Sequence, residues 1–281
     1  MRWPEDAAGW PMAAHSRFVL HRPHRWHVQE AGAGPLVLLI HGAGGATQSW
    51  RGVFPLLTAT ARVVAVDLPG QGFTQLGARM RCGLDHMAED LWSLCRYEGW
   101  KPAVIVGHSA GAAVALRMAE MGACGRVVGV NAALGNFKGV AGWLFPMLAK
   151  ALALSPFTAG LFAASVTEQS VRTLIKGTGS VIDAEGLALY RRLASDRAHV
   201  DGTLAMMAQW RLDGLLRRLP ENPARAVLVA GDRDLAVPPG TSRAAAEAMR
   251  GAEVVMLPGL GHLAHEEDPA TVADIIRRAM G

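Results

Sequence analysis

The pentapeptide GHSAG at residues 107–111 is the part of this 281-residue chain that most narrows its possible folds. The apolar run Ala103–Val106 before it is typical of a buried strand, whereas Ala110–Met121 has the composition of a helix. A serine with a glycine two positions away on either side fits a sharp turn between such elements, because small residues let the backbones pack closely. The motif therefore predicts that Ser109 lies on a strained strand-to-helix turn and acts as a nucleophile.

The rest of the chain alternates short β-rich runs with helical ones. This alternation is typical of an α/β fold in which a mostly parallel central sheet has helices on both faces. An initial hairpin is predicted around Pro23-His24. The predicted strands are Arg17–His21, Arg25–Glu30, Leu36–Ile40, Arg62–Val66, Ala103–Val106, Arg126–Asn131, Arg225–Ala230 and Glu253–Leu257, and the predicted helices include Leu84–Tyr97, Ala110–Met121, Thr241–Met249 and Pro269–Met280.

The alternation stops between about Gly135 and Arg218, where several helices but no clear strand are expected. We therefore predict that residues 135–218 form a helical cap inserted into a core made of residues 1–134 and 219–281.

A serine hydroxyl is a weak nucleophile at neutral pH, so it needs a base and an acid that orients the base. Asp234 and His262 follow the predicted strands that end at Ala230 and Leu257. Both therefore lie at carboxyl ends of strands, the edge where open α/β sheets gather functional groups. We predict a catalytic triad of Ser109, His262 and Asp234.

Each partner of the serine has a rival nearby in the sequence. Asp232 is the alternative acid, and Asp234 is preferred because it lies farther into the loop and can reach across to His262. His265 is the alternative base, but it lies in the start of a helical segment.

A glycine-rich run, HGAGG at residues 41–45, directly follows the predicted strand Leu36–Ile40. A tetrahedral intermediate needs hydrogen-bond donors at its oxyanion, each worth about 3 kcal/mol. We predict that the backbone amides of Ala43 and Ala110 form this oxyanion hole. A phosphate-binding loop is the alternative, but neither GxxxxGK[ST] nor GxGxxG is present. His41 and His108 are expected to hydrogen-bond the backbone near the site.

The cap segment is markedly apolar, since Lys150 is its only charged residue between Lys138 and Glu168. Pro146 and Pro156 argue against a single membrane-spanning helix there. We expect a lid over an apolar pocket; the alternative is a surface that also contacts a membrane. Side chains that would suit a wide planar ligand are Trp143, Met147, Phe157, Met206, Met207 and Trp210.

The overall composition excludes several functions. The net charge of +4 is small and its basic residues are scattered, so no nucleic-acid partner is expected. Cys82, Cys95 and Cys124 lack metal-ligand spacing, and neither a metal nor a cofactor is predicted. No apolar signal stretch is evident near residue 1, so the expected location is the cytoplasm, with membrane association left open.

Four motifs together resemble the α/β-hydrolase superfamily over nearly the whole chain. They are His41-Gly42, DLPGQG at residues 67–72, GHSAG at 107–111, and Gly261-His262 with EDP at 267–269. The resemblance implies the α/β-hydrolase fold, with a mostly parallel sheet flanked by helices and an inserted helical cap.

A narrower resemblance depends mainly on cap residues. Residues 16–19 with 25–29, and residues 177–180, 206–210 and 258–267, look like the magnesium-chelatase accessory proteins of bacteriochlorophyll biosynthesis in photosynthetic bacteria. This resemblance implies a role near magnesium insertion into protoporphyrin IX, an apolar ligand such as a porphyrin or a related ester, and contact with magnesium-chelatase subunits. Two alternatives stay open: a general carboxylesterase with no tie to that pathway, and a non-catalytic porphyrin carrier or chaperone that has kept the serine.

Overall fold

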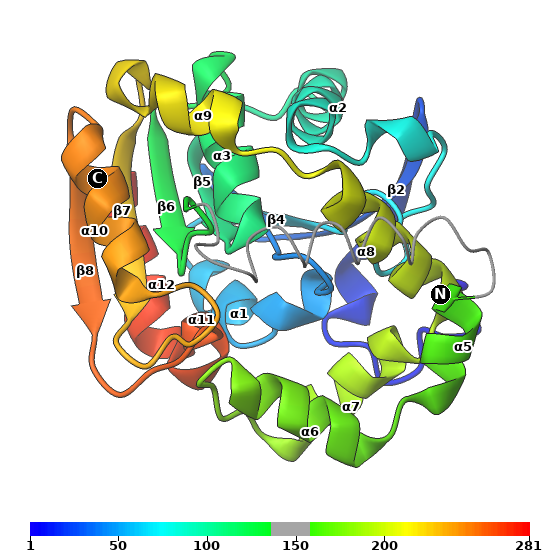
Figure 1. Ribbon diagram of the computed structural model, residues 1–281. Coiled ribbons are helices and arrows are strands. Elements are labelled where there is room, and N and C mark those ends of the chain that lie inside the picture. Colours follow the sequence, from blue (N-terminus) through cyan, green and yellow to red (C-terminus); the bar gives the residue numbers. More distant parts are fainter. Residues whose placement is uncertain (136–157) are drawn as a thin grey trace.

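The computed structural model describes residues 1–135 and 158–281, and its centre is an eight-stranded sheet (Figure 1). The strand order is β1-β2-β4-β3-β5-β6-β7-β8. β1 pairs antiparallel with β2 and β2 antiparallel with β4, whereas every other neighbouring pair is parallel. The strands are β1 (Ser16–His21), β2 (His24–Ala31), β3 (Leu36–Ile40), β4 (Arg62–Val66), β5 (Pro102–His108), β6 (Arg126–Val130), β7 (Arg225–Gly231) and β8 (Ala252–Leu257). The predicted mostly parallel sheet and its initial hairpin are therefore confirmed.

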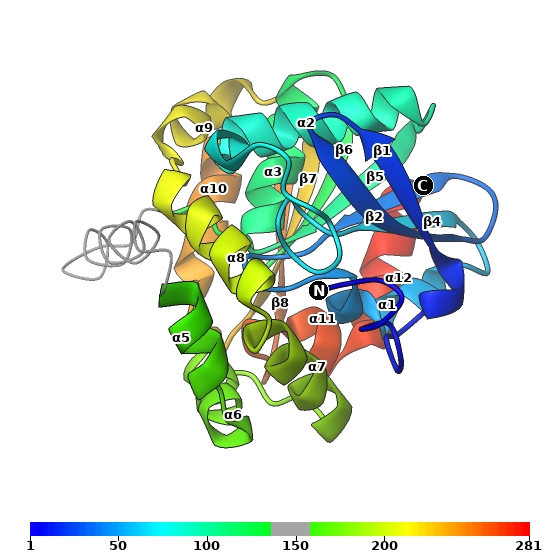
Figure 2. The same cartoon turned by 90° about the vertical axis from the view of Figure 1, so that its right-hand side faces the viewer.

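Helices cover both faces of the sheet, because its strands are apolar on both sides. Leu38 and Ile40 of β3 face the core that contains α2 and α3, while Val37 and Leu39 face α1 and α12. Figures 1 and 2 show these two helix layers on opposite sides of the strands. The core helices are α1 (Val53–Leu57), α2 (Leu84–Tyr97), α3 (Ala110–Glu120), α10 (Pro239–Ala248), α11 (Ala264–Glu267) and α12 (Pro269–Met280), with short 3-10 turns η1 (Ala13–His15), η2 (Thr47–Trp50), η3 (Arg79–Arg81) and η4 (Leu219–Glu221).

Helices joined by loops make up the described residues between β6 and β7, where the sequence analysis expects a cap. They form α5 (Thr158–Ser165), α6 (Glu168–Gly177), α7 (Ala184–Ala194), α8 (Arg197–Gln209) and α9 (Asp213–Arg218). The expectations for Trp143, Pro146, Met147, Lys150, Pro156 and Phe157 lie outside the described residues.

Local sequence explains where three of these helices begin. The side chains of Thr167, Asp183 and Asp196 each accept a hydrogen bond from the backbone amide three residues later, which caps α6, α7 and α8. α9 packs into the main core, since its Leu215 belongs to the large cluster that contains α3, as do Ala205 and Met206 of α8. In Figure 1 α9 accordingly lies beside α3, apart from α5–α7.

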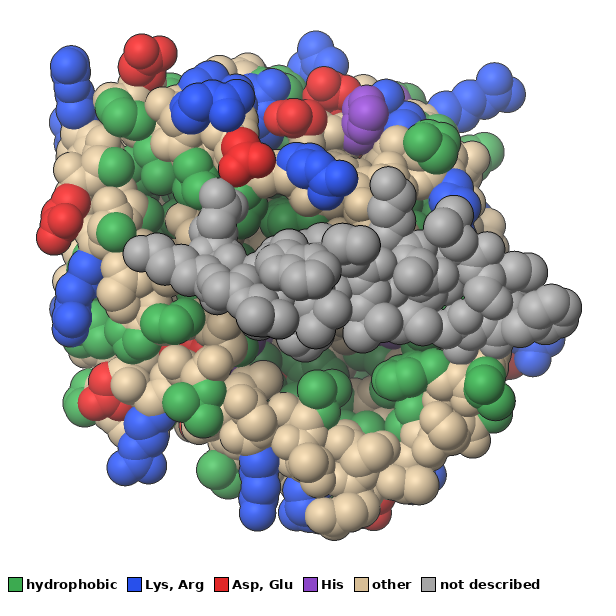
Figure 3. Space-filling model, viewed as in Figure 1, with side chains coloured by type: hydrophobic (Ala, Val, Ile, Leu, Met, Phe, Trp, Pro, Cys, Tyr) green, Lys and Arg blue, Asp and Glu red, His purple; other side chains and the backbone are tan. Residues whose placement is uncertain are grey.

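On the face seen in Figure 3, hydrophobic side chains gather toward the middle, and most charged side chains lie toward the edge of the face. Leu161 and Phe162 of α5 are among the exposed large apolar residues of the described chain. None of the described helices combines the length and the hydropathy needed to span a bilayer.

Candidate active site

Ser109 lies between β5 and α3 in a conformation that is unusual for a residue with a side chain. Its φ and ψ angles are 51° and −115°, and such backbone strain typically costs 1–3 kcal/mol. The flanking glycines are required by packing. A Cβ on Gly107 would lie 2.3 Å from the carbonyl of Gly111, and one on Gly111 would lie 2.4 Å from the carbonyl oxygen of Ile40. Close backbone contact therefore holds the serine on the predicted strand-to-helix turn.

The three predicted triad residues are hydrogen-bonded in a chain. The Ser109 Oγ lies 3.0 Å from the His262 Nε2, and the His262 Nδ1 lies 2.8 Å from the Asp234 Oδ2. This geometry suits an imidazole that accepts the serine proton at one nitrogen while a carboxylate orients the other.

Asp234 is buried, and its two oxygens accept four hydrogen bonds. Its Oδ1 accepts the amides of Ala236 and Val237 at 2.9 and 2.8 Å. Its Oδ2 accepts the side-chain amide of Asn131 at 2.7 Å, in addition to the His262 contact. Sequence reasoning missed Asn131, although its position directly after β6, at the same edge as Ser109 and Asp234, could have revealed it.

The rival acid and base do not join this chain of contacts. Asp232 is exposed and accepts the amide of Gly259 at 2.7 Å. His265 is fully buried between the rings of Trp50 and His108, and neither of its nitrogens has a hydrogen-bond partner among the described residues. Burial lowers the pKa of His265 to about 3, with a smaller contribution from His262.

The predicted oxyanion-hole amides lie next to the serine. Ala110 follows Ser109 directly, and a Cβ on Gly42 would lie 3.1 Å from the Ser109 Cβ, so the loop that carries Ala43 passes beside it. Within the described residues, the amides of Ala43 and Ala110 donate no hydrogen bond. Neither amide thus has an acceptor within residues 1–135 and 158–281, as the predicted role requires.

Two buried histidines hydrogen-bond the backbone here, as expected. His41 donates from Nδ1 to the Gly42 carbonyl at 2.7 Å and accepts the Leu68 amide at Nε2 at 2.9 Å. The Nε2 of His108 lies 2.9 Å from the carbonyl oxygen of His262 and donates to it. Burial lowers the pKa of both imidazoles, which keeps each neutral.

Residues 178–180 contact the loops that carry Asp234 and His262. The carbonyl oxygen of Thr178 accepts the amides of Leu235 and His262, at 3.1 and 3.3 Å. The Ser180 Oγ accepts the amide of Leu263 at 2.8 Å. Sequence analysis linked this segment only to a family resemblance, whereas the structure gives it a physical role beside His262.

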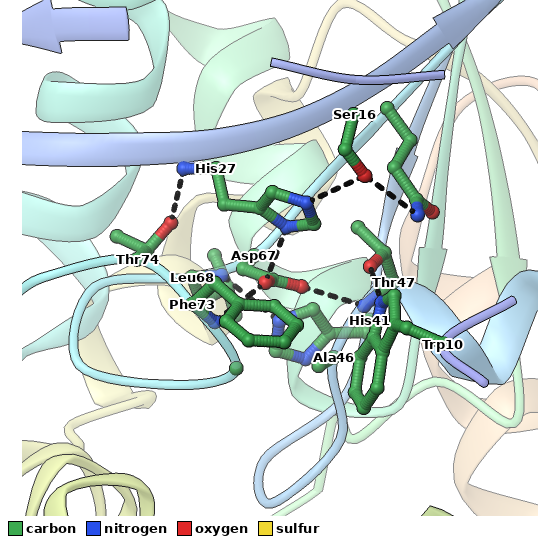
Figure 4. A network of polar contacts seen from close by, with 12 residues as sticks. Trp10, Ser16, His27, His41, Ala46, Thr47, Asp67, Leu68, Phe73 and Thr74 are labelled. Carbon is green, nitrogen blue, oxygen red and sulfur yellow. Dashed lines mark hydrogen bonds and ion pairs between the residues drawn. The ribbon is translucent and has the colours of Figure 1, made fainter. Parts of the chain in front are cut away.

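A second buried network is built around Asp67 and lies close to His41 (Figure 4). The Asp67 carboxylate accepts the His27 Nδ1 at 2.7 Å, the Thr47 amide at 2.6 Å and the Phe73 amide at 2.8 Å. The Ser16 Oγ lies 2.9 Å from the other ring nitrogen of His27. Burial alone would raise the pKa of Asp67, but His27 holds it below its usual value. The network fixes the end of β4 against the start of the chain.

The side chains expected to line a ligand pocket are only partly described. Met206 is buried in the main core, while Met207 and Trp210 are half-buried. Across residues 1–135 and 158–281, no three His, Cys, Asp or Glu side chains are grouped so that they could hold a metal ion.

Comparisons with known proteins agree with this architecture. The sequence profile of the alpha/beta hydrolase family matches residues 37–275. The chain is 46% identical over 264 residues to the magnesium-chelatase 30 kDa subunit of Rhodobacter capsulatus, a match that covers 92% of each protein. It is 33% identical over 225 residues to a pimeloyl-[acyl-carrier protein] methyl ester esterase of Methylococcus capsulatus, covering 75% of this chain and 81% of the esterase.

A solved structure shows the same fold at low sequence identity. The epoxide hydrolase CorEH superposes with a TM-score of 0.79 over 94% of this chain and 97% of its own, at 20% identity. The profile match, the relatives and the sheet topology together show that the chain belongs to the α/β-hydrolase family.

Proposed function

We propose that the protein is a serine hydrolase that cleaves an ester, with Ser109 as nucleophile, His262 as general base and Asp234 as the residue that orients the imidazole. The observation that carries this proposal is the hydrogen-bonded chain from the Ser109 Oγ through His262 to the Asp234 Oδ2. The strained serine backbone and the two amides beside it, which have no acceptor among the described residues, support the same reading.

In the first half-reaction His262 Nε2 takes the proton of Ser109 as the Oγ forms a bond to the acyl carbon. The carbonyl electron pair moves onto the oxygen, which accepts hydrogen bonds from the amides of Ala43 and Ala110. When the intermediate collapses, the bond to the alcohol oxygen breaks and His262 returns the proton to that oxygen. Water then repeats the sequence on the acyl-serine and releases the carboxylic acid.

We place this activity in association with magnesium chelatase. The support is the 46% identity to the Rhodobacter capsulatus magnesium-chelatase 30 kDa subunit over 92% of both proteins. A ligand in that setting is a tetrapyrrole or an ester derived from one, and the apolar composition of the cap suits such a ligand.

The first experiment is covalent labelling with a fluorophosphonate probe, read by intact mass. We expect the wild-type protein to gain one phosphonyl group, and Ser109→Ala to gain none while its circular dichroism spectrum stays unchanged. A folded wild-type protein that remains unlabelled would contradict a serine-based activity.

The second experiment tests the setting with a reconstituted magnesium chelatase and protoporphyrin IX. Addition of the wild-type protein should change the rate of magnesium insertion, and addition of an unrelated esterase should not. If Ser109→Ala acts as well as the wild type, the protein serves the chelatase as a carrier and the hydrolytic proposal fails. If neither protein has an effect, the association with the chelatase is refuted.

A further inference from the structure

The cap helix α8 lies directly against the loop that follows β4. A Cβ on Gly202 of α8 would lie 2.2 Å from the carbonyl oxygen of Gly70, so the two backbones touch where neither residue has a side chain. Gly70 also has a φ of +77°, which favours glycine. The pair of glycines allows α8 to approach the site more closely than a helix with a larger residue could.

His199 lies one turn before Gly202 on α8. It links the loop after β4 to the glycine-rich loop of residues 41–45, which carries Ala43. Its Nδ1 accepts the amide of Gly72 at 3.0 Å, and its Nε2 lies 3.2 Å from the carbonyl oxygen of Gly44. These two contacts together require the tautomer with the proton on Nε2. The side chain is buried, and burial lowers the pKa of His199 to about 4, so the ring is neutral and Nδ1 can accept at pH 7.

The contact with Gly44 acts on the direction of the Ala43 amide. The Gly44 carbonyl and the Gly45 amide belong to one planar peptide unit, so a bond that holds the first also orients the second. The Gly45 amide donates to the Gly42 carbonyl at 3.1 Å. The Gly42 carbonyl in turn shares a planar unit with the Ala43 amide, the predicted oxyanion donor.

Gln71 holds the Ala43–Gly44 peptide unit, which lies between the two units just described. Its Oε1 accepts the Gly44 amide at 2.8 Å, and its Nε2 lies 3.3 Å from the sulfur of Met206 on α8. Contacts that lead to α8 therefore hold both the amide and the carbonyl of Gly44. Without them the backbone of this glycine could adopt many conformations.

We propose that His199 is a positioning residue of the oxyanion hole: through Gly44 and Gly45 it helps to hold the Gly42 carbonyl, which His41 also holds, and so keeps the Ala43 amide directed at the reacting oxygen. The inference rests on the proposed hydrolase function. It adds that a cap residue without any contact to the triad sets the rate of the chemical step.

Two substitutions separate the two hydrogen bonds of His199. Gln places a side-chain N–H near the position of the ring Nε2, so His199→Gln can keep the contact with Gly44. Asn reaches only as far as Nδ1, so His199→Asn can keep the contact with Gly72 alone. Ala198→Gln, an exposed change on the same helix, is the matched control.

The first readout is the second-order rate of fluorophosphonate labelling. We expect His199→Asn to react roughly 10- to 100-fold more slowly than the wild type, less than the loss of an entire oxyanion donor. His199→Gln should recover most of this rate, and Ala198→Gln should react at the wild-type rate. Equal losses in Asn and Gln would show a packing role, and a wild-type rate in His199→Asn would also overturn the proposal.

The second readout does not depend on catalysis. Hydrogen exchange of the Gly45 amide should be faster in His199→Asn than in the wild type, and restored in His199→Gln. If the wild-type protein is not labelled at all, the hydrolase proposal fails, while unchanged Gly45 exchange in all variants would separately refute the link from α8 to the loop.

Discussion

His27 and Asp67 form a fully buried pair, with 2.7 Å between Nδ1 and Oδ2, that repeats the contact between His262 and Asp234. With Ser16 beside the other nitrogen of His27, the described part of the chain contains two serine–histidine–aspartate arrangements. They differ in their surroundings. Ser109 lies on a strained turn next to the amides of Ala43 and Ala110, which have no acceptor among the described residues. Ser16 instead begins a strand, and its Oγ also lies 3.2 Å from the Gln29 side-chain nitrogen.

The first prediction separates these two arrangements. Ser16→Ala should be labelled by a fluorophosphonate at a rate within about twofold of the wild type, while losing about 1 kcal/mol of unfolding free energy because a partly buried hydrogen bond is removed. Ser109→Ala should show the opposite result, with no labelling and little loss of stability. Loss of labelling in Ser16→Ala at full folding would mean that the second arrangement takes part in the chemistry.

The second prediction concerns the acid. Asp234→Asn should lower the labelling rate by roughly 10³- to 10⁴-fold, because an amide stabilises the wrong tautomer of His262. Asp232→Asn changes an exposed side chain in the same loop and should react like the wild type. The reverse order of the two rates would identify Asp232 as the functional acid.

The third prediction concerns acid stability. His265 has a pKa of about 3 in the folded protein and about 6.5 when unfolded, so between these values only the unfolded state binds the proton. Its contribution to stability is therefore complete above about pH 6.5 and is lost as the pH falls toward 3. His265→Leu removes this loss. The unfolding free energy of the variant minus that of the wild type should therefore be about 2 kcal/mol larger at pH 5 than at pH 7.

Urea unfolding at the two pH values measures this difference, with the exposed change His86→Leu as control. A constant difference between His265→Leu and the wild type would show that His265 binds its proton equally well in the folded protein.

The fourth prediction concerns the cap segment beside the triad. Gly179 has a φ of +83°, and a Cβ there would lie 1.9 Å from the carbonyl oxygen of Arg233. Gly179→Ala should therefore cost about 3 kcal/mol of unfolding free energy and slow the labelling of Ser109, since the loops of Asp234 and His262 must shift. Gly177→Ala, at the end of α6 with open space around it, should cost nothing. Equal stability of the two variants would contradict this account.

The sheet was predictable because its signals are local. Leu36–Ile40 and Val63–Val66 are continuous apolar runs that are buried on both faces, and the strands Leu36–Ile40 and Arg62–Val66 form with the predicted bounds. The order of the strands was not readable, since a strand pairs with neighbours that its own sequence does not specify.

The candidate site divides in the same way. Ser109, Asp234 and His262 each follow a recognisable strand, so their meeting at one edge of the sheet could be predicted. Their catalytic use remains a prediction. Asn131 and His199 carry no local motif; the contact of His199 with Gly44 spans 155 residues, and only the tertiary structure brings the two together.

The shared acceptor at Thr178 has a consequence for engineering. Its carbonyl oxygen accepts amides from the loops of both Asp234 and His262. Residues 178–180, which belong to neither loop, therefore help to fix the distance between these two side chains. In a chimera that exchanges residues 135–218, these contacts to the two loops would come from the donor protein. Graft boundaries that leave residues 178–180 with the recipient would let substrate preference be exchanged while the reactive geometry stays native.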